Sequence, residues 1–459
     1  MMSNVDILAA ARKRDSSSDR GPDRATRQDN APHRRFLTTK LHERTGMKIA
    51  VIGTGRVGLP LALAFAESGA DVIGIDINSE IRQAVNVDKT MPFLEPGFEE
   101  ILRSGKLQIR EFIDDVEDVD YFVVTVGTPL LHHIETDLTA VTRVIKDLGT
   151  KIREGQTVVM RSTTAPHTTQ YVKKQLEAAS GLEIGEDIFL ACCPERILEG
   201  KAKEELFALP QIVGTEDTGS RERADALFQV LGVEIMHCDY ITAELVKLFN
   251  NVSRYAYFAI ANVLAMIAID YEAEPYEILR LTNHNYPRPI TSKPGFTAGT
   301  CLRKDFGMLS EAYWSADILV SAWRINESMP KFLVEAAKSK WGDLSELRIA
   351  VLGYSFKRDA DDVRDTLSDK VLRYLHRECP QTLVLHDHLV QQDDVPVMPD
   401  LTFTNDLSVA VSDADLIVIA TNHSLYSDQK DMLMGRVANN SCRIVDIWDS
   451  LGTGSVLLG

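Results

Sequence analysis

The sequence has few cysteines and no long apolar run, and both features narrow the class of protein. Six cysteines in 459 residues fit neither a disulfide scaffold nor a paired CxxC zinc site. They indicate a reducing compartment, and we expect a cytoplasmic protein. No stretch of about 18 uninterrupted apolar residues occurs, so we predict no membrane-crossing helix.

Positive charge is also scarce. The chain has 50 Lys and Arg against 67 Asp and Glu, for a net charge of −17. The first 46 residues carry +4, so the remainder carries −21. A body this acidic disfavours nonspecific nucleic-acid binding. Any anionic substrate must therefore be held by locally placed positive groups.

Length and composition indicate a globular protein of two or three domains, with 44% hydrophobic and 25% charged residues. Residues 1–46 are rich in Ser, Arg, Asp and Pro. We interpret them as a disordered leader, with Met47 as a candidate start. They lack the apolar core of a signal peptide.

The ordered pattern begins with "MKIAVIGTGRVGLPLALAFAESGADVIGIDIN". An apolar strand runs into a GxGxxG turn and a helix, and a second strand ends in Asp76, 23 positions after Gly53. This context is typical of a dinucleotide site, because the helix N-terminus favours a pyrophosphate. Asp76 would bind a ribose diol and repel a 2′-phosphate, which favours NAD over NADP. A purely structural β-turn-α is the alternative. The candidate cofactor contacts are Gly53, Gly55, Arg56, Val57, Gly58, Asp76, Thr128 and Pro129.

Further buried strands follow in "YFVVTVGTP", "TVVMRST", "IFLACCP" and "VEIMHC". Strands alternating with helices predict a parallel, doubly wound sheet, in which ligands lie beyond the carboxyl ends of the strands. Thr128 with Pro129, Ser162 with Thr163, and Pro194 with Glu195 all fall there. Each pair alone could be ordinary turn chemistry.

A long buried helix is predicted over residues 242–274, which contain no Pro or Gly. Lys247 and Asn251 are four residues apart and project from one face, and Glu244 joins them. A buried lysine needs partners. A surface-facing lysine is the alternative.

"GFTAGTCLRKDF" places Cys301 in a loop of small residues. This thiol could be a nucleophile, a metal ligand or an ordinary buried cysteine. A thiol beside a nicotinamide suggests aldehyde oxidation, because cysteine adds to an aldehyde to give a hydride-donating thiohemiacetal. The pair His132 and His133 has no metal-ligand spacing, and we predict no metal site.

A helical connection over 309–340 leads to a second α/β pattern, with Gly353 in "ELRIAVLGYSFKRDADDVRD" and strands ending in Asp387 and Asp446. It lacks a full GxGxxG, so a second dinucleotide site is not expected. The predicted fold is two doubly wound Rossmann-like α/β domains joined by a long central helix and a helical middle domain. The predicted boundaries are 1–46 for the leader, 47–238 for the NAD domain, 239–340 for the helical domain, and 341–459 for a second nucleotide-type α/β domain.

From Met47 onward the chain resembles the UDP-glucose/GDP-mannose dehydrogenase family, NAD-dependent four-electron oxidoreductases of nucleotide sugars. The matching segments keep the family's order and spacing. They are "IGTGRVGLPLA", "FLEPGFEEIL", "VVTVGTPL", "RSTTAPHTT", "CCPERILEG", "AELVKLFNNV", "GFTAGTCLRKD" and "GYSFKRDADDVRDT".

The resemblance implies a role for individual residues. Cys301 matches the nucleophile, Lys247 with Asn251 the oxyanion-stabilising pair, and Asp305 the aspartate that orders water. Thr163 matches the threonine that holds the catalytic water, and Glu195 the base in thioester hydrolysis. The implied substrate contacts are Glu199, Arg288, Gly299, Lys357 and Arg364, where Arg288 would reach across a homodimer.

The sequence also departs from the family pattern, with Gly299 and Thr300 before the cysteine and Gly214 followed by Thr215. "PERILEG" resembles the branch acting on UDP-N-acetylhexosamines, whereas "CLRKD" is closer to the UDP-glucose branch. We expect a UDP-N-acetyl-glucosamine or -mannosamine 6-dehydrogenase of surface polysaccharide synthesis. UDP-glucose oxidation and a catalytically idle nucleotide-sugar binder are the alternatives. A single-step two-electron enzyme is disfavoured, because it needs no such cysteine.

Overall fold

The computed structural model describes residues 46–459 except 114–118, 130, 132–135, 288–291, 313–316 and 439–441. The side chains of residues 300, 301 and 310–312 are also outside this description. The predicted leader, apart from Gly46, the pair His132 and His133, and the predicted substrate contact Arg288 therefore lie outside the described residues.

The first sheet has eight strands in the order β3-β2-β1-β4-β5-β6-β7-β8. All neighbouring pairs are parallel except β6 with β7. The predicted parallel, doubly wound sheet is therefore confirmed apart from that pair, whose connection holds only the five-residue helix α6. The strands are β1 (Lys48–Ile52), β2 (Asp71–Ile75), β3 (Gln108–Arg110), β4 (Tyr121–Val124), β5 (Thr157–Met160), β6 (Phe189–Cys192), β7 (Gln211–Gly214) and β8 (Ile235–Cys238).

Helices cover both faces of this sheet, as the alternation along β1 shows. Ile49 and Val51 pack in one apolar cluster with α1, whereas Ala50 and Ile52 pack in another with α4 and α5. Both faces are buried, which is why the strands are continuous apolar runs. The helical segments are α1 (Gly58–Glu67), α2 (Ser79–Gln83), η1 (Ala84–Asp88), α3 (Glu99–Ser104), α4 (Thr139–Gly149), α5 (Thr168–Ser180), α6 (Ala202–Leu206) and α7 (Thr218–Gln229).

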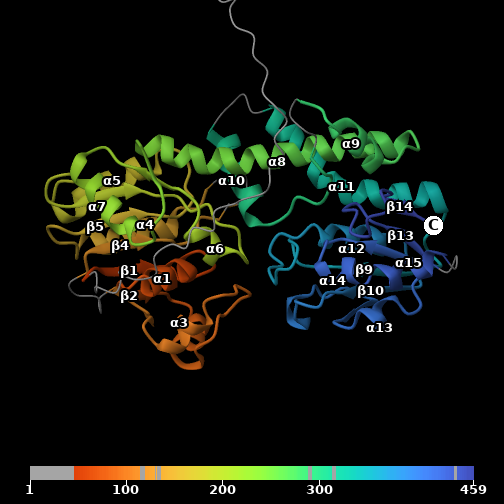
Figure 1. The fold of residues 1–459 in the computed structure, drawn as a ribbon, viewed down its shortest axis with the longest axis horizontal. Coiled ribbons are helices and arrows are strands. Elements are labelled where there is room, and N and C mark those ends of the chain that lie inside the picture. The colour runs from red at the N-terminus through yellow and green to blue at the C-terminus, as the bar shows by residue number, and fades with distance from the viewer. Residues whose placement is uncertain are drawn as a thin grey trace, which may run out of the picture. The chain divides into compact units, whose positions relative to one another are not determined.

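The long helix α8 (Tyr240–Asp270) begins where the Asp239 side chain accepts a hydrogen bond from the Thr242 N–H at 2.8 Å. It ends four residues before the predicted boundary and is drawn as one unbroken green helix in Figure 1. It packs against α10 (Thr300–Ala312) and α11 (Asp317–Trp341), and α9 (Pro275–Asn283) follows it. The predicted helical connection is thus two helices, the first beginning nine residues early.

Within the described residues, α8 is the one helix long and apolar enough by length and composition to cross a membrane. The expectation of no membrane-crossing helix remains a prediction, because passing this test does not show that α8 crosses a membrane. The same test is passed by core helices of soluble proteins, and α8 buries Lys247, Asn251 and Asn262 against protein.

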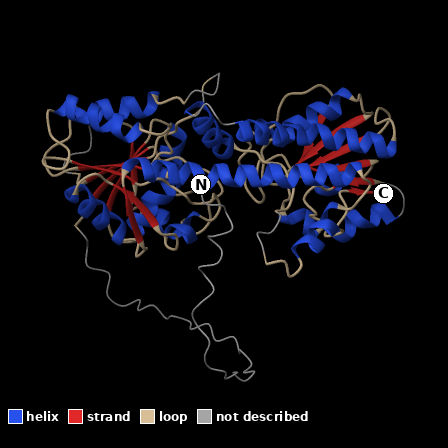
Figure 2. Ribbon diagram, turned by 90° about the horizontal axis from the view of Figure 1, so that it is seen from above, coloured by secondary structure: helices blue, strands red, loops and turns tan. Residues whose placement is uncertain are grey.

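A second sheet follows in the order β11-β10-β9-β12-β13-β14, parallel except for β13 with β14. Figure 2 shows the red strands gathered in two separate sheets. Ile349 and Val351 point into one apolar cluster, and Ala350 and Leu352 into another, so this sheet is also covered on both faces. Its elements are β9 (Arg348–Leu352), α12 (Ser368–Arg377), β10 (Thr382–His386), η4 (Gln392–Asp394), β11 (Leu401–Thr404), α13 (Leu407–Val411), β12 (Leu416–Ile419), α14 (Ser424–Asp428), α15 (Lys430–Ala438), β13 (Arg443–Val445) and β14 (Leu457–Leu458).

Candidate active site

The glycine turn after β1 has the geometry that a dinucleotide requires. Gly53 has φ +92°, and a Cβ there would lie 3.0 Å from the Val126 nitrogen. A Cβ on Gly58 would lie 2.0 Å from the Gly53 oxygen. Gly55, between them, has no atom within 4 Å of a Cβ position. The outer glycines therefore close the turn, and open space remains at the middle one, where a pyrophosphate could approach.

Asp76 follows β2 and is held by the turn itself. Its carboxylate accepts hydrogen bonds from the Thr54 N–H at 2.7 Å and from the Asn78 N–H at 2.9 Å. The side chain is half-buried, so it retains access to a ligand. The start of α1 has no side-chain cap, although the Leu59 N–H donates to the Gly55 carbonyl at 3.0 Å and Pro60 carries no N–H. These residues fit NAD, which would accept a hydride when bound here.

Arg56, a predicted cofactor contact, points its side chain to the loop after β9. Its guanidinium lies 2.8 Å from Asp361 and 3.6 Å from Asp362, and 5.1 Å over the ring of Phe93. A contribution of Arg56 to the cofactor would therefore come through its backbone, as for Val57.

The predicted catalytic groups of α8 are buried and meet residues distant in sequence. Lys247 is 6% exposed, and its Nζ lies 3.8 Å from Glu195 Oε2. The Asn251 amide donates to Asp305 Oδ2 at 2.5 Å. The prediction of a buried rather than surface-facing lysine is confirmed, and four predicted site residues come together.

Asp305 is fully buried, and burial raises the pKa of its carboxyl, while Lys304, Lys247 and Asn251 act to lower it. Its Oδ1 has no hydrogen-bond partner among the described residues. The carboxyl can therefore accept or hold one further hydrogen, from a water or a substrate.

Glu244 shares this face of α8 but serves a structural role. Its carboxylate accepts hydrogen bonds from the N–H groups of His167 and Thr169, both at 2.7 Å. It thereby satisfies the start of α5, and it has no ion pair with Lys247 among the described contacts.

Two predicted residues of the first sheet bond each other, and one of them also bonds Lys304, to which no role was assigned in the sequence analysis. Thr128 donates to the Thr163 carbonyl at 2.5 Å, and the Lys304 ammonium donates to Thr128 Oγ1 at 3.1 Å. Lys304 lies three residues after Cys301, so α10 contacts the carboxyl edge of the first sheet. Pro129 is exposed beside Thr128.

Cys301 lies in the first turn of α10, not in a loop as predicted. The small residues before it form the loop, and the helix begins at Thr300. Gly299 has φ +88°, and a Cβ there would lie 2.6 Å from the Phe356 ring. The approach to the cysteine therefore requires glycine at 299.

The predicted substrate residues Glu199, Lys357 and Arg364 are neighbours. The Lys357 ammonium donates to the Glu199 carbonyl, and the Arg364 guanidinium lies 3.7 Å from the Glu199 carboxylate. Burial raises the pKa of Glu199 and lowers the pKa of Lys357. Glu95, in "FLEPGF", fixes this segment by accepting from the N–H groups of Gly200 and Ala202 at 2.6 and 2.8 Å.

A cavity of about 570 Å³ lies between α8, the segment before α10 and the second sheet. Three cations and three aromatic residues are among its lining: Arg254, Lys293, Arg358, Tyr257, Phe258 and Trp448. None was predicted, because they come from segments that only the folded chain brings together. Elsewhere, the described residues hold no group of three His, Cys, Asp or Glu side chains suited to a metal ion.

Comparison with known proteins places the whole of this architecture in one family. The UDP-glucose/GDP-mannose dehydrogenase family matches in three consecutive parts: its NAD binding domain over residues 47–232, its central domain over 241–329, and its UDP binding domain over 350–452. These ranges contain the glycine turn with Glu195, the residues Lys247, Asn251 and Asp305, and Lys357, respectively.

Individual relatives agree with this assignment. A UDP-N-acetyl-D-mannosamine dehydrogenase of Pyrococcus horikoshii is 33% identical over 388 residues, 82% of this chain and 90% of the relative. A solved UDP-D-ManNAc dehydrogenase from that organism matches with TM-score 0.76 at 32% identity, over 85% of this chain and 93% of the other. A UDP-glucose dehydrogenase of Pyrobaculum islandicum matches with TM-score 0.75 at 26% identity, over 84% and 92%. The chain therefore belongs to the UDP-glucose/GDP-mannose dehydrogenase family and is an NAD-dependent oxidoreductase.

Proposed function

We propose that the protein oxidises the C6 hydroxyl of a UDP-sugar to the uronic acid in two steps, using two NAD⁺ and one water. The observation that carries this proposal is the buried group Lys247, Asn251, Asp305 and Glu195, together with the position of Cys301 in the first turn of α10. A single oxidation of an alcohol needs neither a nucleophilic thiol nor a base for hydrolysis.

In this proposal the Cys301 thiolate adds to the C6 aldehyde left by the first oxidation, giving a thiohemiacetal. Loss of a second hydride gives a thioester, and water cleaves the C–S bond to release the acid and the thiol. The first turn of α10 suits a thiolate, because a helix N-terminus favours negative charge. The Lys247 ammonium stabilises the oxyanion of each tetrahedral species.

The remaining groups prepare the water. Glu195, 3.8 Å from Lys247, serves as base in hydrolysis, and Thr163 holds the water. Asn251 orients Asp305 through its 2.5 Å hydrogen bond. Asp305 Oδ1, which has no hydrogen-bond partner among the described residues, is available for the remaining proton transfer.

For the substrate we favour a UDP-N-acetylhexosamine, with the mannosamine epimer first. Support comes from "PERILEG" and from relatives named UDP-N-acetyl-D-mannosamine dehydrogenase. The Arg196 side chain of that segment donates to the Pro210 carbonyl, so it shapes the segment without needing to reach a sugar. UDP-glucose is the second candidate, supported by "CLRKD" and by the Pyrobaculum relative.

The cavity beside α8 suits the UDP part of the substrate. Arg254, Lys293 and Arg358 supply the local positive charge that a diphosphate needs in a chain of net charge −17. The rings of Tyr257, Phe258 and Trp448 offer faces on which a base can stack. Lys357 and Arg364, with Glu199 and Gly299, would close the sugar end.

We assign a homodimer to the apolar outer stripe of α8. Tyr257, Ile260, Leu264 and Ile267, spaced at three and four residues, are 46–59% exposed. Such a stripe on a long helix calls for a partner, and a second copy presents the same stripe. We also propose that the protein is cytoplasmic and acts in surface polysaccharide synthesis. The proposed domain boundaries are 47–238, 239–340 and 341–459.

Product stoichiometry tests this function. The purified protein should release two NADH for each UDP-N-acetylmannosamine consumed, with a lower kcat/KM for UDP-glucose. One NADH per sugar would indicate a two-electron enzyme. The absence of NADH release with every UDP- and GDP-sugar would favour the alternative of a catalytically idle nucleotide-sugar binder.

A further inference from the structure

The turn after β1 in the first sheet and the turn after β9 in the second sheet have the same backbone arrangement. In register, Ile52 pairs with Ile75, and Leu352 pairs with His386. The Gly53 N–H donates to Ile75 and the Gly353 N–H to His386, both at 2.7 Å. Gly353 has φ +95°, close to the +92° of Gly53. Asp76 and Asp387 therefore occupy the same place, one residue after the strand.

These two carboxylates have different surroundings. Asp387 Oδ2 accepts from the Tyr354 N–H at 2.7 Å, as Asp76 Oδ2 accepts from the Thr54 N–H at 2.7 Å. Asp387 is fully buried and has His423 Nε2 at 3.0 Å, whereas Asp76 is half-buried. Burial alone would raise the pKa of Asp387, but the His423 hydrogen bond and backbone N–H groups lower it to about 2. In the second sheet, the His423 side chain therefore occupies the space beside the aspartate.

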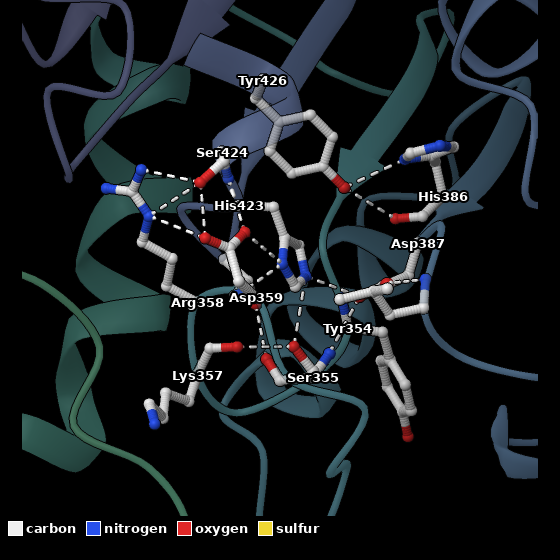
Figure 3. Close-up of polar contacts among 12 residues, drawn as sticks. Tyr354, Ser355, Lys357, Arg358, Asp359, His386, Asp387, His423, Ser424 and Tyr426 are labelled. Carbon is white, nitrogen blue, oxygen red and sulfur yellow. Dashed lines mark hydrogen bonds and ion pairs between the residues drawn. The ribbon is translucent and has the colours of Figure 1, made fainter. Parts of the chain in front are cut away.

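His423 also occupies a position in the second sheet that is equivalent to a position in the first sheet. Ile419 pairs with Leu352 as Val124 pairs with Ile52, so His423 corresponds to Thr128, four residues beyond the strand. Figure 3 shows its ring between Asp359 and Asp387. The Asp359 N–H donates to Nδ1 at 3.0 Å, which requires an unprotonated Nδ1. The proton is therefore on Nε2, facing Asp387 and, at 3.2 Å, the Ser355 hydroxyl.

These contacts hold both ends of residues 354–359, which we call the β9 loop. Ser355 donates to the Lys357 carbonyl at 2.8 Å, and the Ser424 N–H donates to Asp359 at 2.8 Å. Asp359 has φ +52°, a conformation that a non-glycine residue adopts at a cost, and its N–H has His423 as acceptor.

The β9 loop carries two groups that face the candidate active site. The Phe356 ring packs where a Cβ on Gly299 would lie, two residues before Cys301. The Lys357 ammonium donates to the Glu199 carbonyl in the first α/β region. Movement of this loop would therefore displace both the approach to the cysteine and a predicted sugar contact.

We propose that His423, as a neutral Nε2–H imidazole paired with Asp387, is a positioning residue for UDP-sugar binding. It holds the β9 loop, and through it Phe356 and Lys357, in the geometry that the substrate meets. This inference rests on the proposed function for its kinetic consequence, whereas its structural consequence stands alone.

Three variants separate the two hydrogen bonds of His423. His423→Gln can keep a donor toward Asp387, His423→Asn can keep an acceptor for Asp359, and His423→Phe keeps neither. We expect His423→Phe to raise KM for the UDP-sugar by about 10-fold or more, since a buried hydrogen bond to a charged group is lost. KM for NAD⁺ should change much less, and the amide variants should fall between. If His423→Phe does not fold, the KM values of His423→Gln and His423→Asn provide the test.

His386 is the matched control, because it is equally buried in the same cluster but bonds Tyr426 at 2.9 Å and no residue of the β9 loop. His386→Gln should leave KM for the UDP-sugar unchanged. An equal rise in both KM values, or the same rise in His386→Gln, would overturn the proposal.

Amide hydrogen exchange gives a readout that needs no turnover. The amide of Asp359 should exchange faster in His423→Phe and His423→Gln, which lack its acceptor, and at the wild-type rate in His386→Gln. Unchanged exchange over 354–359 would refute the positioning role. Absence of turnover in the wild type, with faster exchange in the variants, would refute the proposed function and leave the positioning role standing.

Discussion

The Asn251 amide lies 2.5 Å from the Asp305 carboxylate, although 54 residues separate them. Both side chains are buried, and the hydrogen bond favours the charged form of Asp305 against the burial that raises its pKa.

We expect Asn251→Ala to raise the pKa of Asp305 further, because the variant removes a donor to the carboxylate. The acid limb of the kcat–pH profile should therefore move to higher pH. Asp305→Asn, which cannot ionise, should remove that limb. An unmoved limb in Asn251→Ala would exclude Asp305 as its source.

Cys301→Ser should reduce formation of the acid by more than about 100-fold and leave NAD binding unchanged, because serine is a poorer nucleophile and leaving group. NADH release and cofactor titration on one preparation measure both. Cys379→Ser, at an exposed thiol, is the control and should retain activity. A Cys301→Ser enzyme with full turnover to the acid would refute the covalent route.

Asp76→Ala should narrow the preference for NAD⁺ over NADP⁺ by about 10-fold or more, because the carboxylate that repels a 2′-phosphate is gone. The ratio of kcat/KM values for the two cofactors measures this. Asp71→Ala, at the exposed opposite end of the same strand, should leave the ratio unchanged. Equal use of both cofactors by the wild type would show that Asp76 does not select.

Burial lowers the pKa of His386 from 6.5 to about 4 in the folded chain. The unfolded chain therefore binds more protons as the pH falls from 6.5 towards 4, and folding stability is lost in that window. The loss approaches about 3 kcal/mol for this group. Burial also lowers the pKa of His388, which acts in the same direction.

Urea unfolding at several pH values measures the effect. His386→Gln should flatten the dependence between pH 6.5 and 4, whereas the low pKa of Asp387 acts only below 3.8. An identical slope in the variant would show that His386 is not its source.

Leu264→Glu should convert the proposed dimer to a monomer, because the variant places a charge in the apolar stripe of α8. Sedimentation velocity measures the change. Val397→Glu, at a fully exposed valine of the second α/β domain, is the control and should leave the mass unchanged. A wild-type monomer, or a dimeric Leu264→Glu, would contradict the assignment.

The sequence predicted features whose causes are local. The GxGxxG turn needs positive φ and close approach at fixed spacings, and the i,i+4 spacing places Lys247 and Asn251 on one helix face. The strands β3 and β11 were not predicted, because they are short and their side chains are mostly not buried. The strand β14 has only two residues, which leaves little pattern to read, whereas β7 was missed although it is as long as the predicted β4, β5 and β6.

The partners across the site depend on tertiary structure and could not be predicted from spacing. Glu244 shares a face with Lys247 yet bonds the start of α5, and Lys304 reaches Thr128 across 176 residues. The small residues before Cys301 favoured a loop, whereas the helix begins at Thr300 because nothing in "TCLRKDF" opposes it.

The repeated backbone arrangement has a thermodynamic consequence. At Asp76 the first sheet leaves a half-buried carboxylate accessible to a ligand, so the stability of this sheet rises with cofactor concentration by mass action. At Asp387 the second sheet has His423 as a permanent internal ligand, present at every concentration. NAD⁺ should therefore slow amide exchange in the first sheet far more than in the second. The chain thus contains the same backbone arrangement twice, once with an aspartate that awaits a ligand and once with an aspartate whose partner is a side chain of the protein.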